Sequence, residues 1–155
     1  MRWAGLILFM VFVGLSGWFM ALPGKPQDRT NTPCLTKVKQ DIAAIAIYQS
    51  DWDDRFPLRD TWMDATLPYT KNEDLFHCPS LQRPDRNPHL YGYCFNAKLS
   101  GAKPVAHPEK TELVFESINQ ARNASGTLTS LPKPGRHKGK NVIGYADTHA
   151  KFVPR

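Results

Sequence analysis

Apolar residues recur with a helical period over a stretch that begins at Cys34. Leu35, Val38, Ile42 and Ile45 follow at spacings of three and four, which puts them on one face of a helix. The pattern predicts an amphipathic helix of about 16–18 residues. We expect it to end in residues 51–57 (DWDDRFP), because three carboxylates would oppose the negative end of the helix dipole.

The rest of the apolar pattern predicts one short helix and several strands. Residues 61–69 (TWMDATLPY) indicate the helix, which Pro68 or the following turn would end. The gap at Asp147 and Thr148 predicts a hairpin. Because β-branched Thr148 resists positive φ, a longer turn or a turn of a different type is the alternative. The predicted fold class is α+β, with the amphipathic helix packed on a small antiparallel sheet. The expected strands cover residues 90–95, 112–116, 141–146 and 149–153.

The N-terminus carries a long apolar run. Ala4 to Leu22 is 19 residues without a charge, and a bilayer core of about 30 Å needs about 20 helical residues. We therefore predict a single-pass transmembrane anchor at residues 1–22 in the cell membrane. A cleaved signal peptide is the alternative, with a shorter apolar region and a small-residue cleavage site. Residues 23–33, with three prolines, predict a spacer before an extracytoplasmic domain at residues 34–155.

Charge is distributed unevenly along the chain. The net charge of +6 comes from 20 Lys and Arg against 14 Asp and Glu, with an acidic excess in residues 41–74 and a basic excess in residues 75–155. The loop at residues 133–140 holds four cations, of which Arg136, Lys138 and Lys140 are candidates for binding an anion, a nucleic acid or a polysaccharide. The simpler interpretation is an exposed loop tip, and nucleic acid is not the favoured partner.

Three cysteines, Cys34, Cys78 and Cys94, form no Cys-x-x-Cys motif, which disfavours a zinc finger or a thioredoxin-like site. Behind a membrane anchor, an oxidised pair is expected. We favour a Cys34–Cys78 disulfide, which would join the start of the long helix to the segment after the short one. Its closed loop of about 44 residues would contribute about 3–4 kcal/mol. Cys78–Cys94 is the competing pair.

Candidate catalytic and metal-binding residues are few. His137, Asp147 and His149 could hold a metal if they shared a face, but a turn at Asp147 would separate them. The chain has no HExxH, P-loop or nucleophile-elbow motif. We therefore expect no cofactor and no enzymatic activity. A metal-dependent enzyme around these three residues is the least favoured function.

Several segments, in order, resemble bacterial prepilin-like proteins. The C-terminal part is similar to that family's motif of His, nine residues and Asp-Gly, with His137 and Asp147 at the matching spacing and Thr148 in the place of the glycine. The prepilin cleavage motif is absent from residues 1–22, and the spacer interrupts the helix that pilins keep continuous. The other matching segments are residues 34–40 (CLTKVKQ), 51–57 (DWDDRFP), 62–69 (WMDATLPY), 76–80 (FHCPS) and 113–117 (LVFES).

The resemblance implies a pilin-like head without catalysis. It predicts a membrane-anchored, pseudopilin-like structural protein of a type II secretion or other cell-envelope assembly. Its expected partners are the membrane, other envelope or secretion proteins, and further copies of itself. The alternative function is an extracytoplasmic binding module that uses the basic loop at residues 133–140.

Overall fold

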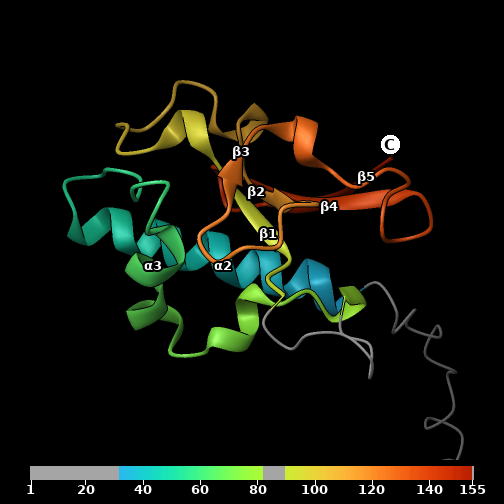
Figure 1. Cartoon of the computed structure of the whole chain (residues 1–155). Helices are drawn as coiled ribbons and strands as arrows, with labels where there is room; N and C mark the ends of the chain where they lie inside the picture. Colours follow the sequence, from blue (N-terminus) through green and yellow to red (C-terminus); the bar gives the residue numbers. More distant parts are fainter. Residues whose placement is uncertain (1–31, 82–89, 155) are drawn as a thin grey trace, which may run out of the picture.

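The structure, a computed structural model, describes residues 32–81 and 90–154 (Figure 1). A long helix and a short helix precede a five-stranded sheet. The helices are α2 (Thr32–Asp51) and α3 (Trp62–Thr70), and the strands are β1 (Tyr93–Asn96), β2 (Glu112–Glu116), β3 (Ser125–Gly126), β4 (Lys140–Tyr145) and β5 (Ala150–Pro154). The expected α+β organisation of helices and strands is thus present in the described part.

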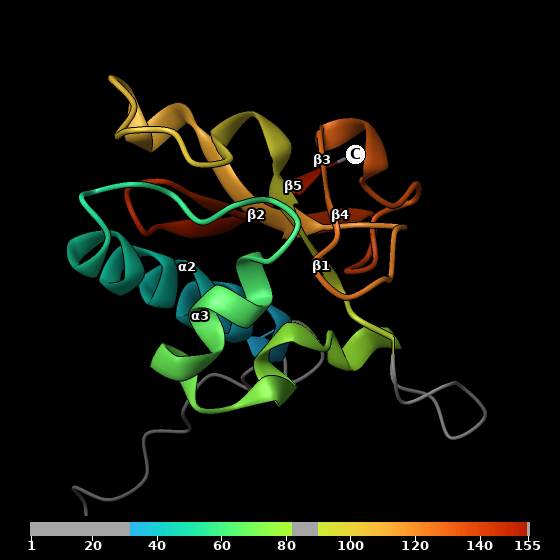
Figure 2. The same ribbon diagram turned by 60° about the vertical axis from the view of Figure 1, so that its left-hand side comes forward.

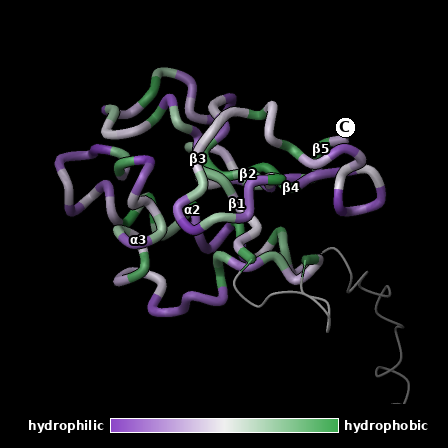
Figure 3. Tube along the Cα trace, in the orientation of Figure 1, coloured by the Kyte–Doolittle hydropathy of each residue, from purple (hydrophilic) through white to green (hydrophobic). Residues whose placement is uncertain are grey.

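Helix α2 lies across one face of the sheet (Figure 1). Cys34, Val38, Ile42 and Ile45 are buried on its inner side, so the helix predicted from their spacing is confirmed. The buried stripe does not extend to Trp52, because α2 ends at Asp51 and Trp52 is 57% exposed. The loop that follows α2 is strongly hydrophilic in Figure 3.

The strand order in the sheet is β3-β1-β2-β4-β5. β1 pairs antiparallel with β2, and β4 pairs antiparallel with both β2 and β5. The expectation of a purely antiparallel sheet is wrong, because β3 pairs parallel to β1. β3 has only two residues and lies in the polar stretch 117–140, where no alternation of apolar residues marks a strand.

In Figure 2 the sheet is seen with α2 on one side of it. The sheet separates two apolar clusters. Side chains of a strand point alternately to its two faces. Phe95, Val114 and Val142 therefore pack in the cluster beneath α2, whereas their strand neighbours pack in a smaller cluster on the opposite face, with Ala124 and Leu131 of the long loop. Those neighbours are Cys94, Phe115 and Ile143.

Gly144 allows α2 to approach β4 closely. A Cβ atom added at this position would lie 2.8 Å from Val38 Cγ1 and 2.9 Å from Ile42 Cγ2, closer than carbon atoms pack. The glycine therefore sets the distance between helix and sheet.

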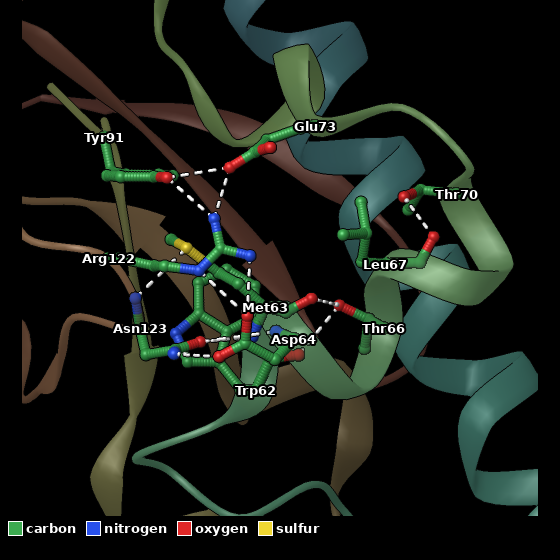
Figure 4. Close-up of polar contacts among 10 residues, drawn as sticks. All are labelled: Trp62, Met63, Asp64, Thr66, Leu67, Thr70, Glu73, Tyr91, Arg122 and Asn123. Carbon is green, nitrogen blue, oxygen red and sulfur yellow. Dashed lines mark hydrogen bonds and ion pairs between the residues drawn. The ribbon is translucent and has the colours of Figure 1, made fainter. Parts of the chain in front are cut away.

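Helix α3 is tied to distant loops by a polar network (Figure 4). Arg122 forms ion pairs with Asp64 of α3 and with Glu73, and its Nη1 donates to the Tyr91 hydroxyl at 2.7 Å. The backbone NH of Met63 donates to Asn123 Oδ1 at 2.8 Å. Three segments that are far apart in the sequence are therefore held at one point.

The β4–β5 connection is longer than two residues. Tyr145 NH donates to the His149 carbonyl at 2.8 Å, and Thr148 NH donates to the Tyr145 carbonyl at 3.0 Å. The loop therefore spans residues 146–149. The expectation that Thr148 resists positive φ is wrong: its φ is 72°, a conformation that costs a β-branched residue free energy.

The prediction of a single-pass membrane protein requires correction. Across residues 32–81 and 90–154, the structure contains no helix that is both long and apolar enough to cross a membrane. The longest helix, α2, carries Lys37, Lys39 and Asp41 within its sequence. The proposed anchor at residues 1–22 and residues 23–31 of the spacer fall outside the described residues. The last two spacer residues, Thr32 and Pro33, already belong to α2, so the expected spacer is too long at its C-terminal end. The fold class is therefore restated as α+β with a mixed sheet and no membrane-spanning helix among the described residues.

Candidate functional site

Four buried side chains from separate parts of the chain meet between α2 and the sheet. Cys34, Cys78, Glu116 and His137 each offer one sulfur, oxygen or nitrogen atom, and these atoms all lie within 4.8 Å of one another. We call this set the Cys–Glu–His cluster. The two Sγ atoms are 2.6 Å apart, and His137 Nε2 is 2.9 Å from Glu116 Oε1. None of the four residues is more than 2% exposed.

The two cysteines are positioned by a helix start and by a close backbone contact. Cys34 lies in the first turn of α2, where unpaired amide groups favour negative charge. Cys78 follows the 3-10 turn Glu73–Phe76 and is fixed against Gly92, where an added Cβ would come within 2.3 Å of Cys78 Cβ. Gly92 NH donates to the Phe76 carbonyl at 3.0 Å. No side chain other than hydrogen fits there, so the glycine allows Cys78 to reach Cys34.

Glu116 and His137 come from the sheet side. Glu116 ends β2, and Val142 NH of β4 donates to its Oε2 at 2.8 Å. Its Oε1 also accepts from the Cys78 thiol at 3.4 Å. His137 opens a tight turn in which Lys138 and Gly139 both have positive φ, and His137 and Lys140 exchange backbone hydrogen bonds. The turn directs the imidazole inward, toward the carboxylate.

Arg136 lies beside the cluster and is turned inward. Its Nη1 is 3.9 Å from Glu116 Oε1 and donates to the Gly92 carbonyl at 3.0 Å, and its Nη2 donates to the Ser117 carbonyl. Its side chain is only 10% exposed. The sequence-based interpretation of Arg136 as a surface anion-binding residue therefore does not fit its position. Lys138 and Lys140, the other two candidates, are exposed.

The cluster shifts the pKa values of its members. A hydrogen bond from the Cys78 thiol lowers the pKa of Cys34 to about 4, although burial opposes the shift. The same interaction, together with burial, raises the pKa of Cys78. Burial disfavours the charged form of His137, but contacts with Cys34 and Glu116 raise its pKa to about 9.

The structure brings together the two cysteines that were predicted to form a disulfide. Cys34 and Cys78 lie together beneath α2, whereas Cys94 points to the opposite face of the sheet. Cys94 belongs to the smaller apolar cluster, and burial raises its pKa to about 11, although contacts with Ser130 and Ser117 oppose the shift. All three are free cysteines in this structure, so the Cys34–Cys78 disulfide stays a prediction.

The candidate metal ligands His137, Asp147 and His149 do not come together, because Asp147 lies in a turn, as expected. His137 precedes β4, whereas Asp147 and His149 lie in the turn after it, at the other end of the hairpin. A strand of this length spans roughly 17–20 Å. Asp147 instead accepts from the backbone NH of His149 at 3.1 Å and contacts the ring of that residue, which lowers the pKa of the exposed carboxyl despite partial desolvation.

Comparisons of the chain with models of protein families, with curated proteins and with solved structures found no match. The resemblance to prepilin-like proteins therefore stays a prediction that rests on motif order.

Glu116 is the member of the cluster that the sequence did not reveal. It ends the segment ELVFE, where it looks like an ordinary polar residue at a strand terminus. The available signal is weak: Glu116 shares the inward face of β2 with Val114, two residues earlier. A carboxylate at a core-facing position predicts a buried partner.

The arrangement is closed to large substrates. The described chain has a shallow cleft of about 540 Å³ beside Asn96, Lys110 and Thr127, and another of about 340 Å³ beside Gln49 and Pro104. No cluster residue lines either cleft. A thiolate–imidazole–carboxylate set can act as a nucleophile only where a substrate reaches the sulfur. The burial of this set instead suits a structural role.

Proposed function

We propose that this chain is a non-catalytic, pseudopilin-like structural subunit that assembles with further copies of itself or with other proteins of a secretion or cell-envelope apparatus. One observation carries the proposal: a partly exposed aromatic surface at the end of α2, in which Trp52 is exposed and Tyr48 and Tyr69 are half-buried. Tyr48 and Trp52 stack at 5.5 Å between ring centroids, and Tyr69 meets Tyr48 edge-on at 6.1 Å. We call Tyr48, Trp52 and Tyr69 the aromatic patch.

Exposure and composition support an interface at this patch. Trp52 is 57% exposed, and Ile47 in the last turns of α2 is 51% exposed. Tryptophan and tyrosine are enriched at protein–protein interfaces, where they bury large areas with little loss of side-chain freedom. Three exposed acidic residues, Asp51, Asp53 and Asp54, lie next to Trp52 in the sequence, and we call them the acidic rim of the patch.

Charge complementarity points to a second copy of the chain as the occupant. Lys133, Lys138, Lys140 and Lys151 are exposed in the C-terminal half, and their charge is opposite to that of the rim. Contact between two different surfaces of one chain is heterologous and generates rings or filaments rather than closed dimers. The lysines of the basic loop then serve this contact rather than a nucleic acid.

The test is self-association of the full chain, measured by sedimentation velocity at low and high salt. The expected result is concentration-dependent assembly that weakens with salt, because rim charges are screened. Trp52→Ser should weaken assembly at least about tenfold, since truncated aromatic anchors typically cost this much. Ile118→Ser is the matched control, because Ile118 is 65% exposed but lies outside the patch.

A monomer at every concentration would overturn self-assembly by this chain, as would equal effects of the two substitutions. Salt-dependent binding of a short single-stranded oligonucleotide that disappears in the Lys138→Gln, Lys140→Gln double variant would favour the alternative binding function instead.

A further inference from the structure

We propose that Cys34, Cys78, Glu116 and His137 bind one Zn²⁺ ion and that this ion is structural. Two thiols, an imidazole and a carboxylate are all established zinc ligands, and structural zinc sites are four-coordinate and closed to solvent. The complete burial of all four side chains matches that type of site. The inference is independent of the proposed function, because it concerns the core and not the aromatic patch.

The distances require only side-chain adjustment. Zinc–sulfur bonds of about 2.3 Å in a tetrahedral site separate two sulfurs by about 3.8 Å, so Cys34 Sγ and Cys78 Sγ, now 2.6 Å apart, would move away from each other. Every pair of ligand atoms already lies within 4.8 Å. The ion would replace the direct contact between His137 Nε2 and Glu116 Oε1.

The local charges support a divalent cation. Two thiolates and the Glu116 carboxylate together carry a charge of about −3 when they bind a metal, because thiol ligands lose their protons. Zinc supplies +2, and the Arg136 guanidinium, 3.9 Å from Glu116 Oε1, supplies the remaining positive charge. Uncompensated charge in a protein core is costly, so this balance accounts for an arginine that is turned inward beside the cluster.

The ligand set also selects the kind of metal. Thiolates favour zinc and other soft or borderline ions, whereas Ca²⁺ and Mg²⁺ take oxygen ligands. Two outer contacts orient the ligands. Val142 NH holds Glu116 Oε2, and Gly92 keeps the Cys78 segment against α2. Outer contacts of this kind are typical of metal sites.

A Cys34–Cys78 disulfide is the rival state of the same residues. It would form by loss of two hydrogen atoms to an oxidant and would remove both thiolates, so zinc and disulfide exclude each other. The disulfide accounts for the two sulfurs. It does not account for a buried carboxylate and imidazole at the same point, which the zinc site explains.

The test is metal analysis of the full chain, purified with a non-thiol reductant and supplied with trace Zn²⁺. About one zinc per chain is expected, retained through dialysis against metal-free buffer. Cobalt substitution should give the absorption of a tetrahedral thiolate site. Cys78→Ser and His137→Gln should both lose the ion, whereas Cys94→Ser, which removes a buried thiol outside the cluster, should keep it.

Substoichiometric zinc that dialysis removes would overturn the proposal. An intact mass two hydrogen atoms below the reduced value, with Cys34 and Cys78 joined in peptide mapping of chain purified without reductant in the presence of zinc, would also overturn it. If Cys78→Ser fails to fold, the wild type still decides: a strong chelator should lower its melting temperature, and added zinc should restore it. No chelator effect would contradict a structural ion.

Discussion

Asp41 is a single buried residue that destabilises the fold that contains it. Its side chain is buried on α2, and neither carboxylate oxygen has a hydrogen-bond partner among the described residues. Burial raises its pKa well above the ordinary value, and the nearby Lys37 offsets only part of that shift. A buried carboxyl of this kind is most stable in its neutral form.

Asp41→Asn should therefore stabilise the protein, and the gain should depend on pH. Since the folded pKa lies above the unfolded value, the contribution of Asp41 is most favourable at low pH and is lost as pH rises through the range between them. Asparagine keeps the shape of the neutral acid. We expect a gain of about 1–3 kcal/mol near pH 8 and a smaller one near pH 5.

Urea unfolding of both proteins at the two pH values measures this difference. Asp51→Asn is the control, because Asp51 is exposed on the same helix. An Asp41→Asn effect that is the same at both pH values would mean that the carboxyl is ionised in the folded protein.

At the scale of elements, the contact between α2 and β4 depends on the absence of a side chain at Gly144. Gly144→Ala should destabilise the protein by about 1–3 kcal/mol, because the added methyl group overlaps Val38 and Ile42. Thermal unfolding followed by circular dichroism measures the loss. Gly126→Ala should have little effect, since its added Cβ would meet Cys94 Sγ at an ordinary 3.5 Å.

A second substitution makes the reason for the loss testable. Val38→Ala in the Gly144→Ala background creates room for the methyl group. The double variant should therefore lose less free energy of unfolding than the sum of the losses in the two single variants. Simple additivity would mean that the overlap with Val38 is not the cause.

The elements were predictable wherever burial on one face left a period in the sequence. α2 follows from Val38, Ile42 and Ile45, and β2 matches the β-prone segment at residues 112–116. β3 was missed because two residues carry no period. The Cys–Glu–His cluster was only partly predictable: Cys34, Cys78 and His137 were candidates on chemical grounds, but their meeting with Glu116 depends on the packing of α2 against the sheet.

At the scale of the whole molecule, Arg122 joins parts of the chain that no strand pairing connects. It contacts Asp64 of α3, Glu73 before Cys78, and Tyr91 before β1. A hydrogen bond from Asn123, together with Arg122, lowers the pKa of Asp64. The stability that ionised Asp64 contributes is therefore present at pH values above the pKa of Asp64 in the unfolded chain. It is lost as pH falls through the lower pKa of Asp64 in the folded protein.

Arg122→Gln should lower the free energy of unfolding by about 1–2 kcal/mol. The charged groups are partly exposed, so solvent screening limits each ion pair to a fraction of that value. Denaturant unfolding should show a smaller loss at high salt than at low salt. Arg59→Gln is the control, since Arg59 forms an ion pair with the adjacent, exposed Asp60, and a loss of equal size there would contradict the role of the network.

The two outer strands of the sheet determine how copies of this molecule can meet. β3 offers only two residues of backbone, and β5 ends at Pro154, which has no amide hydrogen, and carries the exposed Lys151. Short edges, proline and lysine all hinder the addition of a foreign strand. A polymer of this protein would therefore be joined through side chains and would come apart in high salt, unlike a cross-β fibre, whose continuous backbone hydrogen bonding resists it.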